Sequence, residues 1–184
     1  MSSLLALVLV LQLALAATPL PQLFDQALTA SRSGDFAGAL PLWNQVLELA
    51  PSDAAAWSNR GNVQGSLDHW DQARSSFVAA ADARPGFAMA RSSAALSAFQ
   101  LGELEAAERE LRSLIRRYPL FADARAGLTA LLWRRGARGE AESHWASASG
   151  LDPRYRQPEW LLATRRWPPV PVQALADFLA LSSG

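Results

Sequence analysis

The residue types that support nucleophilic, acid–base or metal chemistry are scarce in this chain. It has no cysteine and only two histidines, His69 and His144, far apart in the sequence. The absence of cysteine removes thiol nucleophiles and disulfides, and two distant histidines do not build a histidine-rich metal site. All 17 basic residues are arginine, so no lysine is available as a Schiff-base former or general base. The sequence therefore predicts no metal and no other cofactor.

Carboxylates are dense only between residues 103 and 117, where a pair of them could act as general acid and base. They alternate there with arginines: Glu103, Glu105, Glu108, Glu110, Arg109, Arg112, Arg116 and Arg117. Opposite charges three or four residues apart on a helix pair at its surface, so we predict a solvated, ion-paired face. The chain also lacks serine-hydrolase, zinc-protease and phosphate-binding motifs. We expect a non-enzymatic protein, with an enzyme that escapes motif patterns as the alternative.

The overall charge gives no indication of a nucleic-acid partner. Lys+Arg and Asp+Glu each count 17, so the formal net charge is zero. The densest basic group lies toward the C-terminus and comprises Arg134, Arg135, Arg138, Arg165 and Arg166. Aromatic residues that would stack on bases are not interleaved on that face. We therefore expect a protein or peptide partner and no nucleic acid.

A period of 34 residues organises most of the chain. Four prolines follow one another at this spacing, as do four alanines and a column of large apolar residues. These columns are Pro51, Pro85, Pro119 and Pro153; Ala39, Ala73, Ala107 and Ala141; Trp43, Phe77, Leu111 and Trp145. Two further columns keep the same phase, one of small residues and one of apolar residues: Ala27, Gly61, Ala95 and Thr129; Val46, Ala80, Leu114 and Ala148. Such self-similarity is typical of a repeat protein.

Each column has a physical role in a helix–turn–helix unit. Small residues let two helices approach closely, and a large residue one turn later fills the space between units. Glycines at 34, 102 and 136, and Asp68 in their place in the second unit, are expected to form the turn between the helices. The proline ends the second helix, because it cannot continue the hydrogen-bond ladder. Such a unit cannot bury its apolar face alone, so stacking of units must provide the core.

These residues resemble the tetratricopeptide-repeat family, most clearly in the second unit. The order there is Trp57, Gly61, Ala73, Phe77, Ala80 and Pro85. The resemblance implies an all-α, right-handed solenoid of four units at residues 20–53, 54–87, 88–121 and 122–155. Arg91 and Arg125 depart from the family pattern, since a large apolar residue is usual at their positions.

The residues before the repeat predict export of the protein, and those after it predict a cap on the solenoid. Leu4 to Ala17 is nearly all apolar and too short for a membrane span, and Ala14-Leu15-Ala16 is a cleavage signal. Residues 1–16 are thus predicted to be a signal peptide, or an uncleaved membrane anchor as the alternative. We expect a periplasmic, thylakoid-lumenal or membrane-anchored protein.

The segment 156–184 is predicted to cap the solenoid with a helix over 172–181, after an extended break at Trp167-Pro168-Pro169-Val170-Pro171. Its run Arg165-Arg166-Trp167-Pro168-Pro169 is similar to the tails of some cyanobacterial and chloroplast repeat proteins that help assemble photosynthetic complexes. A partner-docking role for this run is the alternative to capping.

The resemblance also implies a concave groove lined by the first helix of each unit. We expect a partner segment to contact groove residues that include Phe24, Asn59, Asn62, Leu96, Phe99 and Trp133. Packing of Phe99 and Trp133 against neighbouring units is the competing interpretation. A clamp for a partner's C-terminal carboxylate is not expected, because Asp123 stands where a lysine would be needed.

The predicted function is that of a non-enzymatic scaffold that holds partners during assembly of a membrane or photosynthetic complex. The alternative is an accessory adaptor that recruits substrates to an envelope enzyme or secretion system.

Cleavage after Ala16 would give a mature protein that begins near Ala17. N-terminal sequencing of protein purified from its native host tests this expectation. An intact Met1 in the membrane fraction would favour the anchor instead.

Overall fold

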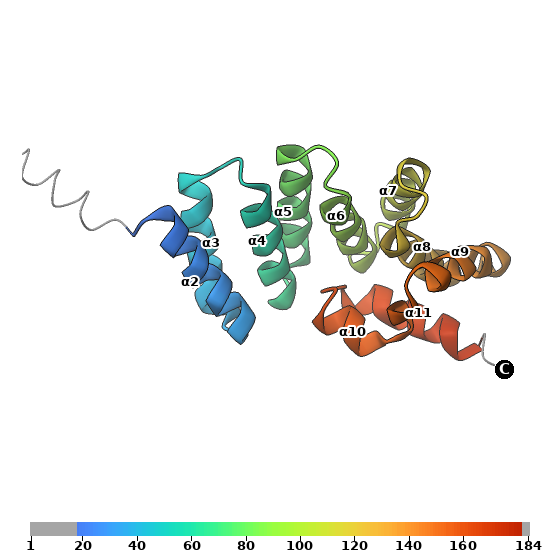
Figure 1. The fold of residues 1–184 in the computed structure, drawn as a ribbon. Helices are drawn as coiled ribbons and strands as arrows, with labels where there is room; N and C mark the ends of the chain where they lie inside the picture. Colours follow the sequence, from blue (N-terminus) through green and yellow to red (C-terminus); the bar gives the residue numbers. More distant parts are fainter. Residues whose placement is uncertain (1–17, 182–184) are drawn as a thin grey trace, which may run out of the picture.

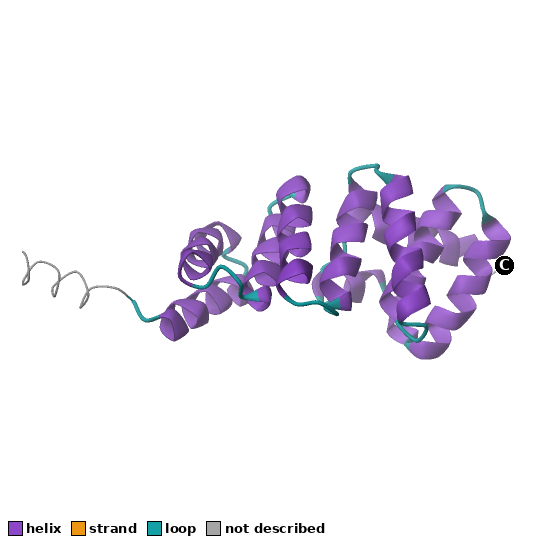
Figure 2. Cartoon of the chain, turned by 90° about the horizontal axis from the view of Figure 1, so that it is seen from above, coloured by secondary structure: helices purple, strands orange, loops and turns teal. Residues whose placement is uncertain are grey.

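The computed structural model describes residues 18–181, so the predicted signal peptide and its cleavage site lie outside the described residues. Every regular element in this range is helical (Figures 1 and 2). The elements are α2 (Leu20–Ser33), α3 (Phe36–Leu49), α4 (Ala54–Ser66), α5 (Trp70–Ala83), α6 (Ala88–Gln100), α7 (Leu104–Arg117), α8 (Ala122–Arg134), α9 (Arg138–Leu151), η1 (Pro153–Arg156), α10 (Pro158–Ala163) and α11 (Pro169–Leu181). Among them, no helix has the length and apolar character needed to cross a bilayer. The first eight form consecutive antiparallel pairs, which confirms the all-α solenoid of four units.

The turns within the helix pairs lie at the glycines predicted from the sequence, and at Asp68 in the second unit. Gly34, Gly102 and Gly136 have φ angles of 82°, 82° and 79°. This left-handed conformation suits glycine and directs the chain into the next helix. Asp68 takes the same place with φ 61°. The second helix of each pair ends two residues before the repeat proline, at Leu49, Ala83, Arg117 and Leu151.

The columns of small and large residues form the contacts between helices. Ala39, Ala73, Ala107 and Ala141 are all completely buried. A Cβ atom at Gly61 would lie 2.7 Å from the ring of Phe77, so the small residue lets the large one enter. Trp43 and Leu111 are also fully buried at the large position. The pattern therefore encodes the interfaces that stack the units.

The buried apolar residues do not form one continuous core. One cluster joins α2, α3 and α4 around Trp43, and a larger one extends from α6 to α11. Between them lies a small cluster of Ala73, Phe77 and Ala94, against which Trp70 packs. Units two and three thus meet at α5 and α6 through a small cluster that is separate from the other two.

The C-terminal segment folds back along the solenoid, so that α11 packs on α8 and α6 (Figure 1). Leu175 and Phe178 are 1% and 2% exposed, which agrees with the predicted capping helix. Its position differs from the expectation, because α11 covers the inner face of the last two units and not only their end. The predicted extended break is wrong at its C-terminal part. Pro169 and Pro171 lie in the first turn of α11, where proline does not disturb the hydrogen-bond ladder.

Truncating the cap at its most buried aromatic residue should destabilise the whole C-terminal half. Phe178→Ala removes a ring that packs edge-on against Trp133 and Trp145, at centroid distances of 5.7 and 5.9 Å. We expect a loss of about 3–5 kcal/mol in the free energy of unfolding, measured by denaturant titration. Leu181→Ala is the matched control on the same helix, because Leu181 is 69% exposed. Equal effects of the two changes would contradict a packed cap.

Candidate partner-binding groove

The inner face of the solenoid is divided by the C-terminal segment into a filled half and an open half. The first helices of the units, α2, α4, α6 and α8, lie along this face, and α11 occupies it over α6 and α8 (Figure 1). The backbone N–H of Val170 donates to Oε1 of Gln100 at 2.8 Å, which fixes the start of α11 against the end of α6. Over α4, the structure places only the first residue of α11, Pro169, beside a small pocket.

One buried carboxylate fastens the segment to the solenoid. Asp123, at the start of α8, is 1% exposed. It accepts hydrogen bonds from Ser92 Oγ at 2.6 Å and Tyr155 O–H at 2.8 Å. It also accepts one from Trp167 Nε1 at 3.0 Å and forms an ion pair with Arg165. Arg165 and Trp167 come from beyond the repeat, and Tyr155 is the last residue of the fourth unit.

The environment of Asp123 raises the pKa values of Tyr155 and Arg165. Burial raises the pKa of Tyr155 above its ordinary value, and the neighbouring Asp123 carboxylate adds to this. Burial alone would lower the pKa of Arg165, but the Asp123 carboxylate outweighs it and the pKa lies above its usual range. Tyr155 therefore stays neutral and Arg165 charged at physiological pH. These are the states that donate to a carboxylate.

Three of the six predicted groove residues take part in packing in this structure. Leu96 and Phe99 are each 1% exposed, in the apolar cluster that extends from α6 to α11. Trp133 is partly buried and packs against the ring of Phe178. These contacts agree with the competing interpretation of Phe99 and Trp133 as packing residues. Contact of any of the three with a partner stays a prediction.

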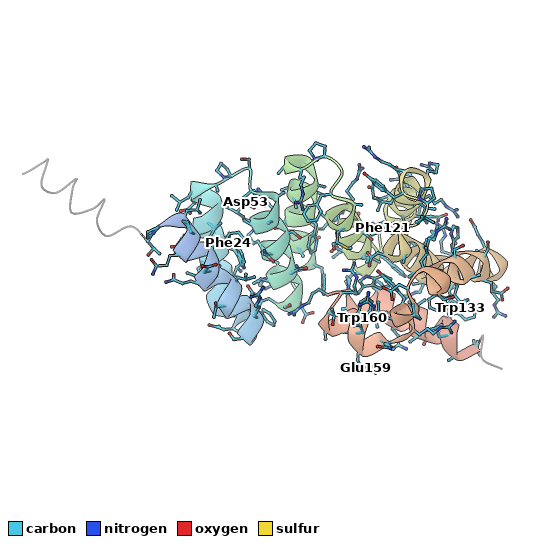
Figure 3. The ribbon with its side chains drawn as sticks, in the orientation of Figure 1. Phe24, Asp53, Phe121, Trp133, Glu159 and Trp160 are labelled. Carbon is cyan, nitrogen blue, oxygen red and sulfur yellow. The ribbon has the colours of Figure 1, made fainter. Side chains whose placement is uncertain are left out.

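The other three predicted residues lie on the open half. Phe24 on α2 is partly exposed, and its ring meets that of Trp43 edge-on at 4.9 Å (Figure 3). Asn59 and Asn62 share one face of α4 and are partly exposed. Within the described part of the chain, neither amide side chain takes part in a hydrogen bond. These amides are free to bind groups from outside the molecule.

A small pocket lies where the open half meets the tail. Its volume is about 150 Å³, and α4, the turn after it, α5 and the tail line it. Its lining includes Asn62, Asp68, Trp70, Phe77, Leu162 and Arg166. Arg166 extends further and places its guanidinium 5.6 Å from the ring centre of Phe36. The tail thus forms a wall at the edge of the open half.

The residues first considered for chemistry are not assembled into a reaction centre. His69 is exposed in the turn before α5. His144 is half-buried on α9, where burial lowers its pKa, and its Nε2 lies 3.9 Å from Glu140 Oε1. The predicted ion-paired face is present on α7, where Arg112 contacts Glu108 at 2.8 Å and Glu140 at 2.6 Å. Among residues 18–181, no group of three or more acidic or histidine side chains is placed to hold a metal ion.

The tail network escaped sequence reasoning because its members belong to no shared motif. Ser92 comes from the third unit, Asp123 and Tyr155 lie at the two ends of the fourth, and Arg165 and Trp167 come from beyond it. The one available signal was an acidic residue at a groove position, facing a tail rich in aromatic and arginine residues. Only the fold-back of α10 and α11 brings these residues together.

Removing the carboxylate should be far more harmful than removing an exposed one. Asp123→Ala leaves Arg165 buried without a partner, which we expect to cost about 3–5 kcal/mol of unfolding free energy. Trp167→Phe removes one hydrogen-bond donor and should cost about 1–2 kcal/mol. The matched control is Asp25→Ala on α2, where the carboxylate is exposed. Denaturant titration with tryptophan fluorescence measures all three, and an Asp123→Ala variant as stable as the control would contradict the network.

Comparison with known proteins supports the fold and the repeat. The model of the tetratricopeptide repeat matches residues 24–64, 59–110 and 93–155. No curated protein sequence matches the chain. The crystal structure of MamA protein superposes with a TM-score of 0.66, at 19% identity over 88% of both chains.

Two further solved structures show the same architecture. YrrB, described as a TPR protein with an unusual peptide-binding site, has a TM-score of 0.62 and 19% identity, over 88% of this chain and 86% of its own. PilF from Pseudomonas aeruginosa has a TM-score of 0.64 and 17% identity, over 90% and 77%. Similarity at this level of identity concerns the fold. With the repeat match covering most of its length, the chain belongs to the tetratricopeptide-repeat family.

Proposed function

We propose that the protein is a non-enzymatic scaffold that binds a segment of another protein in the open half of the groove, over α2 and α4. The observation that carries this proposal is the division of the inner face. The tail fills the half over α6 and α8, whereas Phe24, Asn59 and Asn62 remain partly exposed. The site proposed from the structure is therefore smaller than the one expected from the repeat pattern.

The chemistry of the open half suits a peptide. An asparagine amide offers both a donor and an acceptor, and so it can pair with the N–H and C=O groups of a peptide backbone. The ring of Phe24 supplies apolar area beside these polar groups. The family as a whole binds protein or peptide partners, and the name given to YrrB describes a peptide-binding site. Both support a protein segment as the ligand.

The tail itself supports this mode of binding. In the filled half, α11 lies on α8 and α6 with Leu175 and Phe178 buried, so this face accommodates a helix. The buried position of Trp167 favours capping over docking for the run 165–169, because its ring is 3% exposed. Arg166 remains exposed at the edge of the open half and is available to a partner.

The N-terminal residues support the cellular location that we propose. The apolar run Leu4 to Ala17 supports export to the periplasm or thylakoid lumen, or attachment to a membrane. In that setting the scaffold would act during assembly of a membrane or photosynthetic complex. Recruitment of substrates to an envelope enzyme or secretion system is the alternative.

A photo-crosslinking residue in place of Asn62 should capture the partner from the native membrane fraction. The same residue in place of Ser143, exposed on α9, is the control. Mass spectrometry of the adducts then identifies the bound segment, which can be synthesised. We expect Asn59→Ala and Asn62→Ala each to weaken its binding by about 1 kcal/mol, because each removes a hydrogen bond to the peptide. Full affinity in both variants, with unchanged thermal stability, would contradict the groove.

A further inference from the structure

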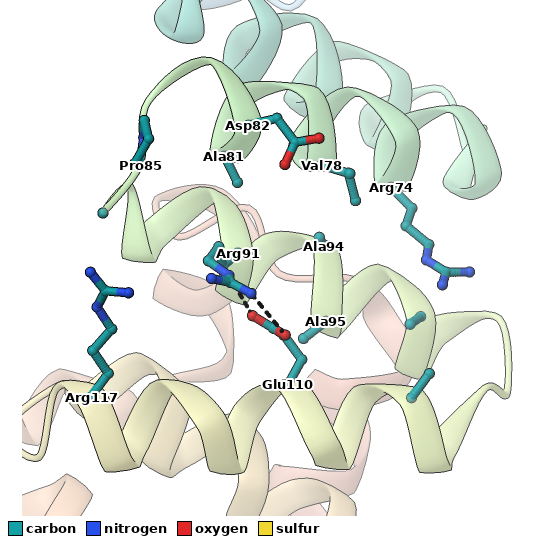
Figure 4. A pocket seen from close by; sticks show the side chains of 13 residues that line it. Arg74, Val78, Ala81, Asp82, Pro85, Arg91, Ala94, Ala95, Glu110 and Arg117 are labelled. Carbon is teal, nitrogen blue, oxygen red and sulfur yellow. Dashed lines mark hydrogen bonds and ion pairs between the residues drawn. The ribbon is translucent and has the colours of Figure 1, made fainter.

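A second cavity lies away from the groove, on the other side of α6. This outer cleft, of about 490 Å³, opens between α5 and α7 above α6 (Figure 4). Its apolar lining consists mainly of small side chains: Val78, Ala81, Ala94, Ala95, Ala98 and Ala106. The tail is fixed to the opposite side of α6, where Ser92 contacts Asp123. The outer cleft is therefore separate from the proposed groove.

One residue that lines the outer cleft departs from the repeat in its contacts. Trp57 and Arg125 occupy equivalent places in units two and four, and both fold back onto the preceding loop. Trp57 Nε1 donates to the carbonyl oxygen of Pro51, and Arg125 Nε to that of Pro119, each at 2.8 Å. Arg91, the equivalent residue in unit three, instead reaches across to Glu110, with Nε 2.6 Å from Oε1. Arg91 and Glu110 thus join α6 to α7 within the outer cleft.

The charges around the outer cleft give it a closed end and an open end. At one end Arg74 on α5 and Glu103, directly before α7, form an ion pair at 2.5 Å that closes the outer cleft. At the other end Arg117 on α7 is exposed, and its described contact is with the ring of the adjacent Tyr118, at 5.6 Å. Asp82, on the α5 lip, is exposed and has no ion pair within the described residues. Figure 4 shows Arg74 and Arg117 at opposite ends, with Arg91 and Glu110 between them.

We propose that the outer cleft is a second interaction surface, which binds a protein segment with an aliphatic side chain close to an acidic residue. The aliphatic side chain enters over the alanine floor, since burial of apolar surface there is favourable and no native side chain fills the space. The acidic residue pairs with Arg117, because the other two arginines that line the outer cleft, Arg74 and Arg91, already have ion pairs. Asp82 and Glu110 line the same cleft and favour a peptide, which carries donors, over an acyl chain.

This surface does not depend on the proposed groove. Its lining comes from α5, α6 and α7, whereas the groove residues lie on α2 and α4. A scaffold with two such faces can hold two partners at once. Variants in one face should therefore leave binding at the other unchanged, so each proposal can fail by itself.

Selection of random peptides displayed on phage, against the immobilised full chain, tests the proposal. We expect the enriched peptides to combine Leu, Ile or Met with Asp or Glu a few residues away. Fluorescence polarisation of a synthesised peptide should show binding weakened about tenfold or more by Ala81→Leu, which fills the outer cleft from its partly exposed lip. Arg117→Glu should weaken it similarly, and changing the peptide's acidic residue to lysine should restore binding to that variant.

Arg116→Glu is the matched control, because Arg116 is an exposed neighbour that does not line the outer cleft. It should bind the peptide like the unaltered chain. Circular dichroism shows whether Ala81→Leu folds. If it does not, Arg117→Glu still tests the proposal, because it changes only a charge on the surface. The proposal is overturned if no peptide is enriched, if binding survives Arg117→Glu, or if the lysine peptide does not recover it. Binding that is lost in Asn62→Ala instead would assign the peptides to the groove.

Discussion

A buried carboxylate needs several hydrogen-bond donors, and Asp123 obtains three of its four from residues that follow α9. Without Tyr155, Arg165 and Trp167, its remaining partner is Ser92. A buried charge with so few partners is strongly unfavourable, so the last two units depend on the segment that follows them. The contacts of Arg165 and Trp167 with Asp123 hold the tail against α8, and α11 then lies along α8 and α6.

The same requirement explains how a short solenoid is stabilised. Four units leave apolar surface exposed at both ends and on the inner face, and neighbouring units cover only part of it. The tail adds a layer across α6 and α8, so that the larger apolar cluster extends from α6 to α11. Units one and two have no such layer, and their cluster around Trp43 stays separate. Buried apolar packing is thus more extensive over the last two units than over the first two.

A repeat residue that keeps the pattern is occupied with packing, as Ala73 and Phe77 are, and has little surface left for a ligand. Arg91 departs from the pattern, because it leaves the loop contact that Trp57 and Arg125 make and pairs with Glu110 in the outer cleft. The groove residues proposed for binding lie on α2 and α4, and the outer cleft opens between α5 and α7. The two proposed surfaces are therefore on different elements of the solenoid.

The sequence by itself determined the repeat, and with it most of the fold. Period, helix pairs, turn positions and the helix ends before each proline depend on local contacts within one unit and between neighbours. Such contacts recur every 34 residues and are therefore visible as columns. The groove side of α2 and α4 was predictable for the same reason, although nothing yet tests Phe24, Asn59 and Asn62 as contacts.

Only the tertiary structure decided which part of that groove is open. The tail lies outside the period, so no column indicates where it packs, and the residues that fix it are far apart in sequence. Ser92 and Trp167 meet the same carboxylate across more than two units of chain. The ion pair in the outer cleft depended on the structure as well, because arginine at position 91 can turn to the preceding loop, as Arg125 does, or to Glu110. The carboxylate on α7 attracts the guanidinium, and the columns of the repeat do not include this pair.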